Sequence, residues 1–292
     1  MKDQKTQKID WFNYWKGFTL GFVMLAWIIA VFYLRYPLWI LLPIIFVYLV
    51  INAIIFYSYY LGMVGNYFYF VRQPDKALKY YRKAIAKNTK NATALYNYAL
   101  EMLHQGNAQE ALKYFELSEK YNTKLFYEKN IPIAKSSCYW VMGGEENIRK
   151  AIAILEELKD SYQYVNVGAY TSLGYFYLLV GELDKALEYT NIALEDDREH
   201  APAWDNLGQI RFAQGDMEAA EEAFTKALSF RSYMVDSLFY MGVIYERKKD
   251  KQKALEYYKR AAECNISALN TVTREQVENK IKALEKAADE KE

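Results

Sequence analysis

The chain has 292 residues, with 37 Lys and Arg against 36 Asp and Glu, so its formal net charge is only +1. This balance excludes the basic excess by which nucleic-acid-binding domains neutralise phosphates. The two cysteines, Cys138 and Cys264, form neither a CxxC pair nor a metal-ligand spacing, so a disulfide framework is unsupported and we expect buried, reduced thiols.

The first 57 residues predict two membrane-spanning helices. Residues 1–16 form a short cytoplasmic or interfacial lead that ends in aromatic side chains, as expected where a chain meets a bilayer. Residues 17–34 contain no charge and make about 27 Å of helix at about 1.5 Å per residue, enough to cross a membrane. A second uncharged run covers residues 38–57, and only residues 35–37 separate the two. We therefore expect a helical hairpin.

Positive charges beside these runs predict the orientation of the hairpin. Lysines precede the first run, only Arg35 lies between the runs, and five basic residues follow the second, at Arg72, Lys76, Lys79, Arg82 and Lys83. Positive flanks stay on the cytoplasmic side, so both termini are expected in the cytoplasm. The first run exceeds the apolar core of a signal peptide and lacks a cleavage site, which favours an uncleaved anchor. A bacterial cytoplasmic membrane is the expected location, with the endoplasmic reticulum as the alternative.

Three residues of the hairpin are candidates for helix contacts within the membrane. Asn52 is the one strongly polar side chain of the second run, and we expect it to hydrogen-bond to the neighbouring helix, with a substrate contact as the alternative. Gly17 and Gly21 form a small-xxx-small pair that lets helices approach closely. Neither run contains an acidic or basic residue, which disfavours a channel or transporter built from this chain alone.

From residue 58 to residue 268, one pattern of about 34 residues recurs six times. Each copy has an alanine near the start of its second half, at Ala77, Ala111, Ala151, Ala186, Ala220 and Ala254. Subtracting successive numbers gives spacings of 34, 40, 35, 34 and 34. Seven positions after each of these alanines comes a second residue that is usually small. A residue that is usually bulky lies between the two. A fixed period of this length is typical of stacked helical pairs.

These residues resemble the tetratricopeptide repeat, most clearly in residues 201–234, which contain Trp204, Leu207, Gly208, Gly215, Ala220, Phe224 and Ala227. The resemblance implies an all-α fold in which a right-handed solenoid of about six helix pairs follows the hairpin. The pairs are expected at about residues 58–91, 92–125, 130–166, 167–200, 201–234 and 235–268. Residues 269–292 are expected to form a capping helix and tail, in which Thr273 and Gln276 resemble a capping box.

Glycine recurs at two kinds of position in the repeats. The first is mid-helix, where glycine costs about 0.5–1 kcal/mol relative to alanine and is tolerated when another helix packs on the backbone, as expected at Gly174, Gly208 and Gly242. The second is the turn inside each pair, where glycine supplies a positive φ, as expected at Gly106, Gly181 and Gly215. Lys249 stands at this turn position in the sixth unit.

Two units depart from the pattern. The third is six residues longer than its predecessor, so we expect a longer first helix or an irregular loop around residues 128–132, and a lengthened turn after Gly143 and Gly144. The first unit shares its first helix with the end of the second apolar run. No Gly-, Ser- or Pro-rich linker separates them, so we expect the span to run straight into the solenoid.

The resemblance implies that the first helices of the pairs line a concave groove that binds segments of other proteins. The candidate groove residues are Tyr96, Asn97, Leu100, Thr171, Tyr175, Asp205, Asn206, Gln209, Phe239, Tyr240 and Val243. Tyrosines, aliphatic residues and amides suit an extended or helical apolar segment. Packing between adjacent repeats is the alternative for each tyrosine. Only Lys135 and Arg247 offer the cations by which chaperone-binding members clamp a terminal carboxylate, so we expect no such clamp.

The sequence predicts no enzyme, no metal site and no cofactor. His104 and His200 are expected as solvated helix-end residues, and paired acids such as Glu156 and Glu157 as exposed charge. No nucleotide-binding glycine loop, nucleophile elbow or HExxH occurs.

We predict a membrane-anchored scaffold or adaptor that binds partner proteins in its groove at the cytoplasmic face. The alternative is an accessory or assembly subunit of a larger complex for secretion, transport or envelope biogenesis that docks through the hairpin. The partner, the pathway and the oligomeric state stay open.

Overall fold

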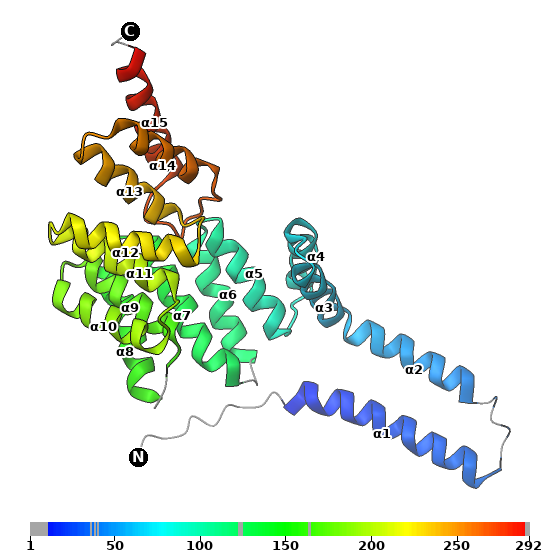
Figure 1. Cartoon of the computed structure of the whole chain (residues 1–292). Coiled ribbons are helices and arrows are strands. Elements are labelled where there is room, and N and C mark those ends of the chain that lie inside the picture. Colours follow the sequence, from blue (N-terminus) through cyan, green and yellow to red (C-terminus); the bar gives the residue numbers. More distant parts are fainter. Residues whose placement is uncertain are drawn as a thin grey trace. The chain divides into compact units, whose positions relative to one another are not determined.

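The computed structural model describes residues 11–35, 37, 39, 41–121, 125–162 and 165–289. Within these ranges the regular elements are helical and no strand occurs, which confirms the all-α class (Figure 1). The chain divides into two compact units, Met1–Ala94 and Leu95–Glu292. Residues 1–10 of the predicted lead and residues 36, 38 and 40 of the predicted hairpin lie outside the described residues.

The first unit contains four helices, α1 (Trp11–Tyr33), α2 (Leu41–Ile55), α3 (Tyr57–Phe70) and α4 (Pro74–Ala86). The last six residues of the predicted lead belong to α1 and are not a separate segment. Among the described residues, no single helix combines the length and apolar composition needed to span a membrane, and Gly21–Tyr33 is a shorter apolar helix. The pair α2 and α3 meets these criteria together, although its axes bend by 74°.

This bend corrects one expectation. The second apolar run was expected to continue straight into the first repeat, whereas α2 ends at Ile55 and α3 begins at Tyr57. Asn52 on α2 accepts a hydrogen bond of 2.7 Å from the Tyr60 hydroxyl on α3, so the amide is paired across the bend. Gly17 and Gly21 both lie in α1, and a Cβ at Gly21 would meet nothing within 4 Å, so this glycine makes no close contact with another helix in the described part of the chain.

Helices α3 and α4 form the first repeat. The Tyr81 ring of α4 is fully buried against the backbone of α3, because a Cβ at Gly65 would lie 2.5 Å from two of its ring carbons. The Tyr81 hydroxyl donates a hydrogen bond of 3.1 Å to Asn66 on α3. The first repeat therefore closes on the same kind of glycine-to-ring contact as the later ones.

Paired helices continue through the second unit, each pair followed by the next along the chain (Figure 1). They are α5 (Ala92–His104), α6 (Ala108–Tyr121), α7 (Leu125–Met142), α8 (Glu145–Ser161), α9 (Val167–Leu179), α10 (Leu183–Asp196), α11 (Ala201–Ala213), α12 (Met217–Phe230), α13 (Val235–Arg247) and α14 (Lys251–Glu263). Each first helix from α9 onward contacts its own second helix and both helices of the preceding pair. The repeating alanines are fully buried in these contacts.

The glycine positions behave as the sequence predicts. A Cβ at Gly208 would lie 2.5 Å from the Phe224 ring, and one at Gly242 would lie 2.5 Å from the Tyr258 ring. The turn glycines have φ values of 82°, 78° and 84° at Gly106, Gly181 and Gly215. Lys249 adopts φ 62° at the same turn position, so the chain keeps the left-handed turn even where it lacks glycine.

The third repeat is longer because its helices are longer. Helix α7 has 18 residues, begins at Leu125 and not near residue 130, and contains Pro132. Helix α8 has 17 residues. Only Gly143 and Gly144 join them, with φ values of 72° and 82°. The lengthened turn predicted here is therefore wrong, and the longer first helix is right.

The capping helix also differs in extent from its prediction. Helix α15 (Arg274–Asp289) starts five residues later than the expected boundary at 269. Its capping box is present, because the Thr273 backbone N–H donates to the Gln276 side chain at 2.7 Å and the Gln276 N–H donates to the Thr273 hydroxyl at 3.2 Å. The ten residues 264–273 between α14 and α15 form an irregular segment, which we call the strap.

Candidate functional site

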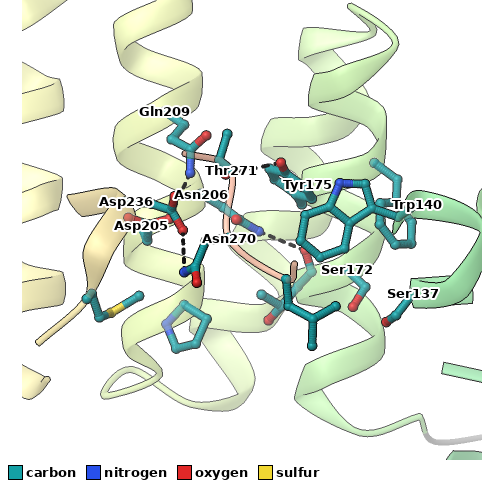
Figure 2. Close-up of a pocket in the computed structure, with 15 residues that line it drawn as sticks. Ser137, Trp140, Ser172, Tyr175, Asp205, Asn206, Gln209, Asp236, Asn270 and Thr271 are labelled. Atoms are coloured by element: carbon teal, nitrogen blue, oxygen red, sulfur yellow. Dashed lines mark hydrogen bonds between the residues drawn. The ribbon is translucent and has the colours of Figure 1, made fainter. Parts of the chain in front are cut away.

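A cavity of about 250 Å³ lies among α7, α9, α11, the start of α13 and the strap (Figure 2). Five of the candidate groove residues line it, namely Thr171, Tyr175, Asp205, Asn206 and Gln209. They come together because α9 and α11 are first helices of successive repeats, and equivalent faces of such helices point to the same side of the stack. The cavity is therefore the part of the predicted groove that the second unit encloses.

Hydrogen bonds fix the polar side chains of the cavity (Figure 2). The Asn206 amide donates 2.7 Å to the Thr171 carbonyl and so ties α11 to α9. The Gln209 amide donates 2.8 Å to one oxygen of Asp205, and the Ser237 hydroxyl of α13 donates to the other. Because Asp205 has partners on two successive repeats, its carboxylate helps set their spacing.

The strap enters the cavity and is held there by polar contacts. The Asn270 amide donates 3.2 Å to one oxygen of Asp236, and the Val272 backbone N–H donates 3.0 Å to the other. The Tyr175 and Thr271 hydroxyls lie 3.1 Å apart in a hydrogen bond that joins residues 96 positions apart. The strap thus reaches from the sixth repeat to the fourth.

The two aspartates form a buried acidic pair. Burial, together with the nearby Asp236 carboxylate, raises the pKa of Asp205 to about 7. Burial likewise raises the pKa of Asp236, against the hydrogen bonds from the strap, which favour its charged form. Since the groups interact, they titrate as a pair that holds a proton at pH values where an exposed aspartate has none.

We expect this pair to make stability fall as the pH rises. A carboxyl group whose pKa is raised in the folded state stabilises the fold fully below its ordinary pKa of about 4, and that stability is lost as the pH rises through about 7. Between pH 5 and pH 8 the wild type should lose about 1–3 kcal/mol of unfolding free energy relative to Asp205→Asn, which stays neutral. Urea unfolding at both pH values measures this difference. Asp184→Asn, at an exposed position, should keep the wild-type profile, and parallel profiles for Asp205→Asn would contradict the account.

Aromatic side chains form one wall of the cavity. The Trp140 ring of α7 meets Tyr175 edge to face at 5.1 Å and lies 6.3 Å from the Phe176 ring. Sequence reasoning missed Trp140, together with Ser137, Ser172 and Asp236. Trp140 belongs to the third repeat, whose extra residues obscured the register. Asp236 lies in the first turn of α13, and none of the predicted groove residues occupies the equivalent position of another repeat.

The other candidate groove residues lie outside this cavity. Tyr96 packs on Phe115 within its own repeat, and Tyr240 lies between the rings of Phe212 and Phe224. Phe239 and Val243 pack in the cluster around Tyr258, while Asn97 and Leu100 are half-buried on α5. Tyr240 therefore packs between adjacent repeats, which is the alternative named above for each tyrosine.

The two cations near the groove are engaged elsewhere. Lys135 pairs with Glu119 at 3.1 Å, and the Arg247 guanidinium lies 4.6 Å from the centre of the Phe212 ring. None of the residues that line the cavity, all within the described part of the chain, is Lys, Arg or His.

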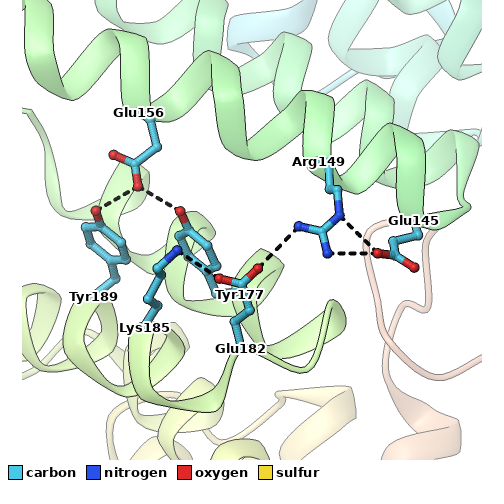
Figure 3. A network of polar contacts seen from close by, with 7 residues as sticks. All are labelled: Glu145, Arg149, Glu156, Tyr177, Glu182, Lys185 and Tyr189. Atoms are coloured by element: carbon cyan, nitrogen blue, oxygen red, sulfur yellow. Dashed lines mark hydrogen bonds and ion pairs between the residues drawn. The ribbon is translucent and has the colours of Figure 1, made fainter.

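A polar network braces the third repeat against the fourth (Figure 3). Glu156 accepts hydrogen bonds from the Tyr189 hydroxyl at 2.7 Å and the Tyr177 hydroxyl at 3.0 Å. Burial acts to raise the pKa of Glu156, but these bonds and one from Lys159 hold it below its usual value. Beside it, Arg149 bridges Glu145 and Glu182. Glu156 is therefore not the exposed solvating charge that the sequence suggested.

Other titratable residues lie outside the cavity. Among the described residues, no group of three or more His, Cys, Asp or Glu side chains is arranged to hold a metal ion. Cys138 is buried and free, and burial raises its pKa to about 12. His200 precedes α11 and is half-buried, so burial lowers its pKa, whereas the sequence had suggested a solvated side chain.

Comparisons with known proteins agree with this fold. Residues 64–122 and 199–266 match the tetratricopeptide repeat. The chain is 27% identical over 238 residues to response regulator aspartate phosphatase E of Bacillus subtilis, covering 70% of this chain and 60% of that protein. It is also 27% identical over 217 residues to a TPR repeat-containing protein of Methanocaldococcus jannaschii, covering 67% and 36%. The chain thus spans less than two thirds of either relative.

Solved structures show the same architecture. A tetratricopeptide repeat protein from Parabacteroides merdae aligns with a TM-score of 0.64 and 16% identity, covering 78% of this chain and 84% of that one. At this identity the likeness concerns the fold. Residues 64–122 and 199–266 therefore carry tetratricopeptide repeats, and the chain has the all-α helical-repeat fold of this neighbour.

Proposed function

We propose that this protein is a membrane-anchored scaffold, without enzymatic activity, that holds a segment of a partner protein in the cavity among α7, α9, α11 and the strap. The observation that carries this proposal is the composition of the cavity, which combines the aromatic wall of Trp140 and Tyr175 with the polar side chains of Asp205 and Asn206. Tetratricopeptide repeats commonly bind proteins or peptides, so the fold and the cavity favour the same kind of ligand.

The cavity has the character of a binding hot spot. Trp and Tyr are enriched where a few residues supply most of the binding free energy, since their rings bury a large area with few rotatable bonds. Trp140 and Tyr175 already contact each other, and Asn206 is already hydrogen-bonded to α9. A partner therefore meets side chains fixed beforehand, which lowers the entropic cost of binding.

The charge of the cavity restricts its ligand. Asp205 and Asp236 are its acidic lining residues, and no cation among the lining residues balances the negative charge of the pair. A terminal carboxylate would be repelled here, so the ligand is an internal segment of a partner and not a free carboxyl terminus.

The membrane part of the proposal rests on the apolar surface of α1 and α2. Large apolar side chains are more than half exposed on both helices, including Leu25 and Ile29 on α1 and Phe46 and Ile54 on α2. Exposed apolar area of this extent marks a surface that a bilayer or another protein covers. The basic residues that follow favour the cytoplasmic face for the repeats.

The proposal is tested by partner recovery from crosslinked native membranes. Three proteins are compared: the full chain, the chain with residues 1–57 replaced by an unrelated two-helix anchor, and Trp140→Ala. The first two should recover the same partners, and Trp140→Ala should recover at least roughly tenfold less, since a hot-spot truncation costs about 2 kcal/mol or more and about 1.4 kcal/mol is tenfold in affinity. Trp204→Ala is the matched control, because Trp204 lies on α11 away from this cavity.

A second candidate function is docking of the hairpin itself onto a larger membrane complex, favoured by the same exposed apolar side chains. In that case the unrelated anchor would lose the partners and Trp140→Ala would keep them. That pair of results would overturn the groove as the recognition site.

A further inference from the structure

The strap is longer than a connection between helices needs to be. Four residues, 231–234, join α12 to α13, whereas ten residues, 264–273, join α14 to α15. The connection therefore has six residues in excess of its predecessor. The middle of the strap, at Leu269, Asn270 and Thr271, lines the cavity. Long ordered connections inside a compact repeat array commonly have a function of their own.

The contacts of the strap are those that a bound segment would make. Its Asn270 amide and Val272 N–H donate to Asp236, and its Thr271 hydroxyl bonds to Tyr175. At its other end, a Cβ at Gly106 would lie 3.6 Å from the Ala268 methyl, so the strap also reaches the end of α5. The strap thus crosses first helices of several repeats, as a segment bound along a concave groove does.

The strap is also built to move as a unit. The Ser267 N–H donates 2.9 Å to the Asn270 side chain and the Asn270 N–H donates 3.1 Å to the Ser267 carbonyl, so a turn satisfies its own polar groups. Only Val272 of the strap is fully enclosed, while Ala268 is exposed. Releasing residues 265–271 would therefore break a few hydrogen bonds and uncover two half-buried side chains, Leu269 in the cavity and Ile266 on the cluster around Val235.

We propose, resting on the function proposed above, that the strap is a built-in competitor for the groove and that its own chemistry describes the partner. The partner segment is uncharged, like residues 264–273, and presents amide and hydroxyl groups to Asp236 and Tyr175. Tethering gives the strap an effective concentration on the order of millimolar. A partner must therefore bind more tightly than the strap, or release it, before it occupies the cavity.

The test uses the full chain in mild detergent and a fluorescent synthetic peptide of residues 264–273 with blocked ends. In one variant, residues 265–271 are replaced by a Gly/Ser sequence of equal length, which keeps Val272 and the Thr273 capping box. Fluorescence anisotropy should show the peptide binding this variant at least roughly tenfold more tightly than the wild type, because the competitor is gone. Adding Tyr175→Phe to the variant should weaken binding, since the hydroxyl partner of Thr271 is lost.

A milder variant keeps the inference testable if the loop replacement disturbs folding. Asn270→Ala with Thr271→Ala removes contacts of the strap to Asp236 and Tyr175 and leaves every helix unchanged, so peptide binding should rise in the same direction by a smaller factor. Equal peptide binding by the wild type and both variants, or no binding to folded variants, would overturn the inference. If the membrane partners still depend on Trp140 in that case, the groove function stands and only the role of the strap is wrong.

Discussion

Replacing Gly208 by alanine is expected to lower the free energy of unfolding by about 1–3 kcal/mol, although alanine is the better helix former. The added Cβ would lie 2.5 Å from the Phe224 ring, which is fully buried. The ring has no room to retreat, because Tyr240 stacks on it with a centroid distance of 5.5 Å. Steric strain therefore exceeds the gain in helix propensity. Urea unfolding of the full chain in mild detergent measures the effect.

The same contact allows a double-mutant cycle. Phe224→Leu makes the partner smaller, so Gly208→Ala combined with Phe224→Leu should cost less than the sum of the two single changes. Gly21→Ala is the matched control, because a Cβ there meets nothing within 4 Å and the substitution should cause no loss. Additive effects would show that the clash with Phe224 does not set the cost at Gly208.

The second large effect concerns membrane association. Lysines at Leu25, Ile29, Phe46 and Val50 would place four charges on apolar faces of α1 and α2 that are exposed in the chain itself. Each lysine near the centre of a span costs about 2.5–3.5 kcal/mol on insertion scales. The quadruple variant should therefore move from the carbonate-resistant membrane fraction to the soluble fraction.

A control separates insertion from simple charge. Lysines at the exposed positions Asn191, Thr225, Ser229 and Gln252 add the same four charges to the second unit, and this variant should stay in the membrane fraction. If the variant altered in α1 and α2 also stays there, these helices do not hold the protein in a bilayer.

The repeats were predictable from the sequence because their contacts are local. Gly208 and Phe224 meet within one repeat, so the sizes of residues less than 20 positions apart encode the packing of the two helices. The turn conformation is equally local, and Lys249 keeps it at the position where glycine is usual. The bend between α2 and α3 was missed, since neither glycine nor proline marks it at Phe56.

The candidate site was predictable only in part. Thr171, Tyr175 and Asp205 were found because repeat register assigns them to one face of the first helices. Trp140 escaped this reasoning because the six extra residues of the third repeat could have lengthened a helix or a turn, and both readings fit the same spacing. The strap was not predicted because its position depends on contacts between residues far apart in the sequence, such as that of Thr271 with Tyr175. No local pattern encodes such a contact.

Site-specific photo-crosslinking in native membranes tests most directly whether the groove holds a partner. A photoreactive residue at Ser172, inside the cavity, is compared with one at Glu188, on the exposed face of α10. The account predicts discrete protein adducts from position 172 that disappear when Trp140→Ala is added and are absent from position 188. No adduct at position 172, or the same adducts from both positions, would contradict it.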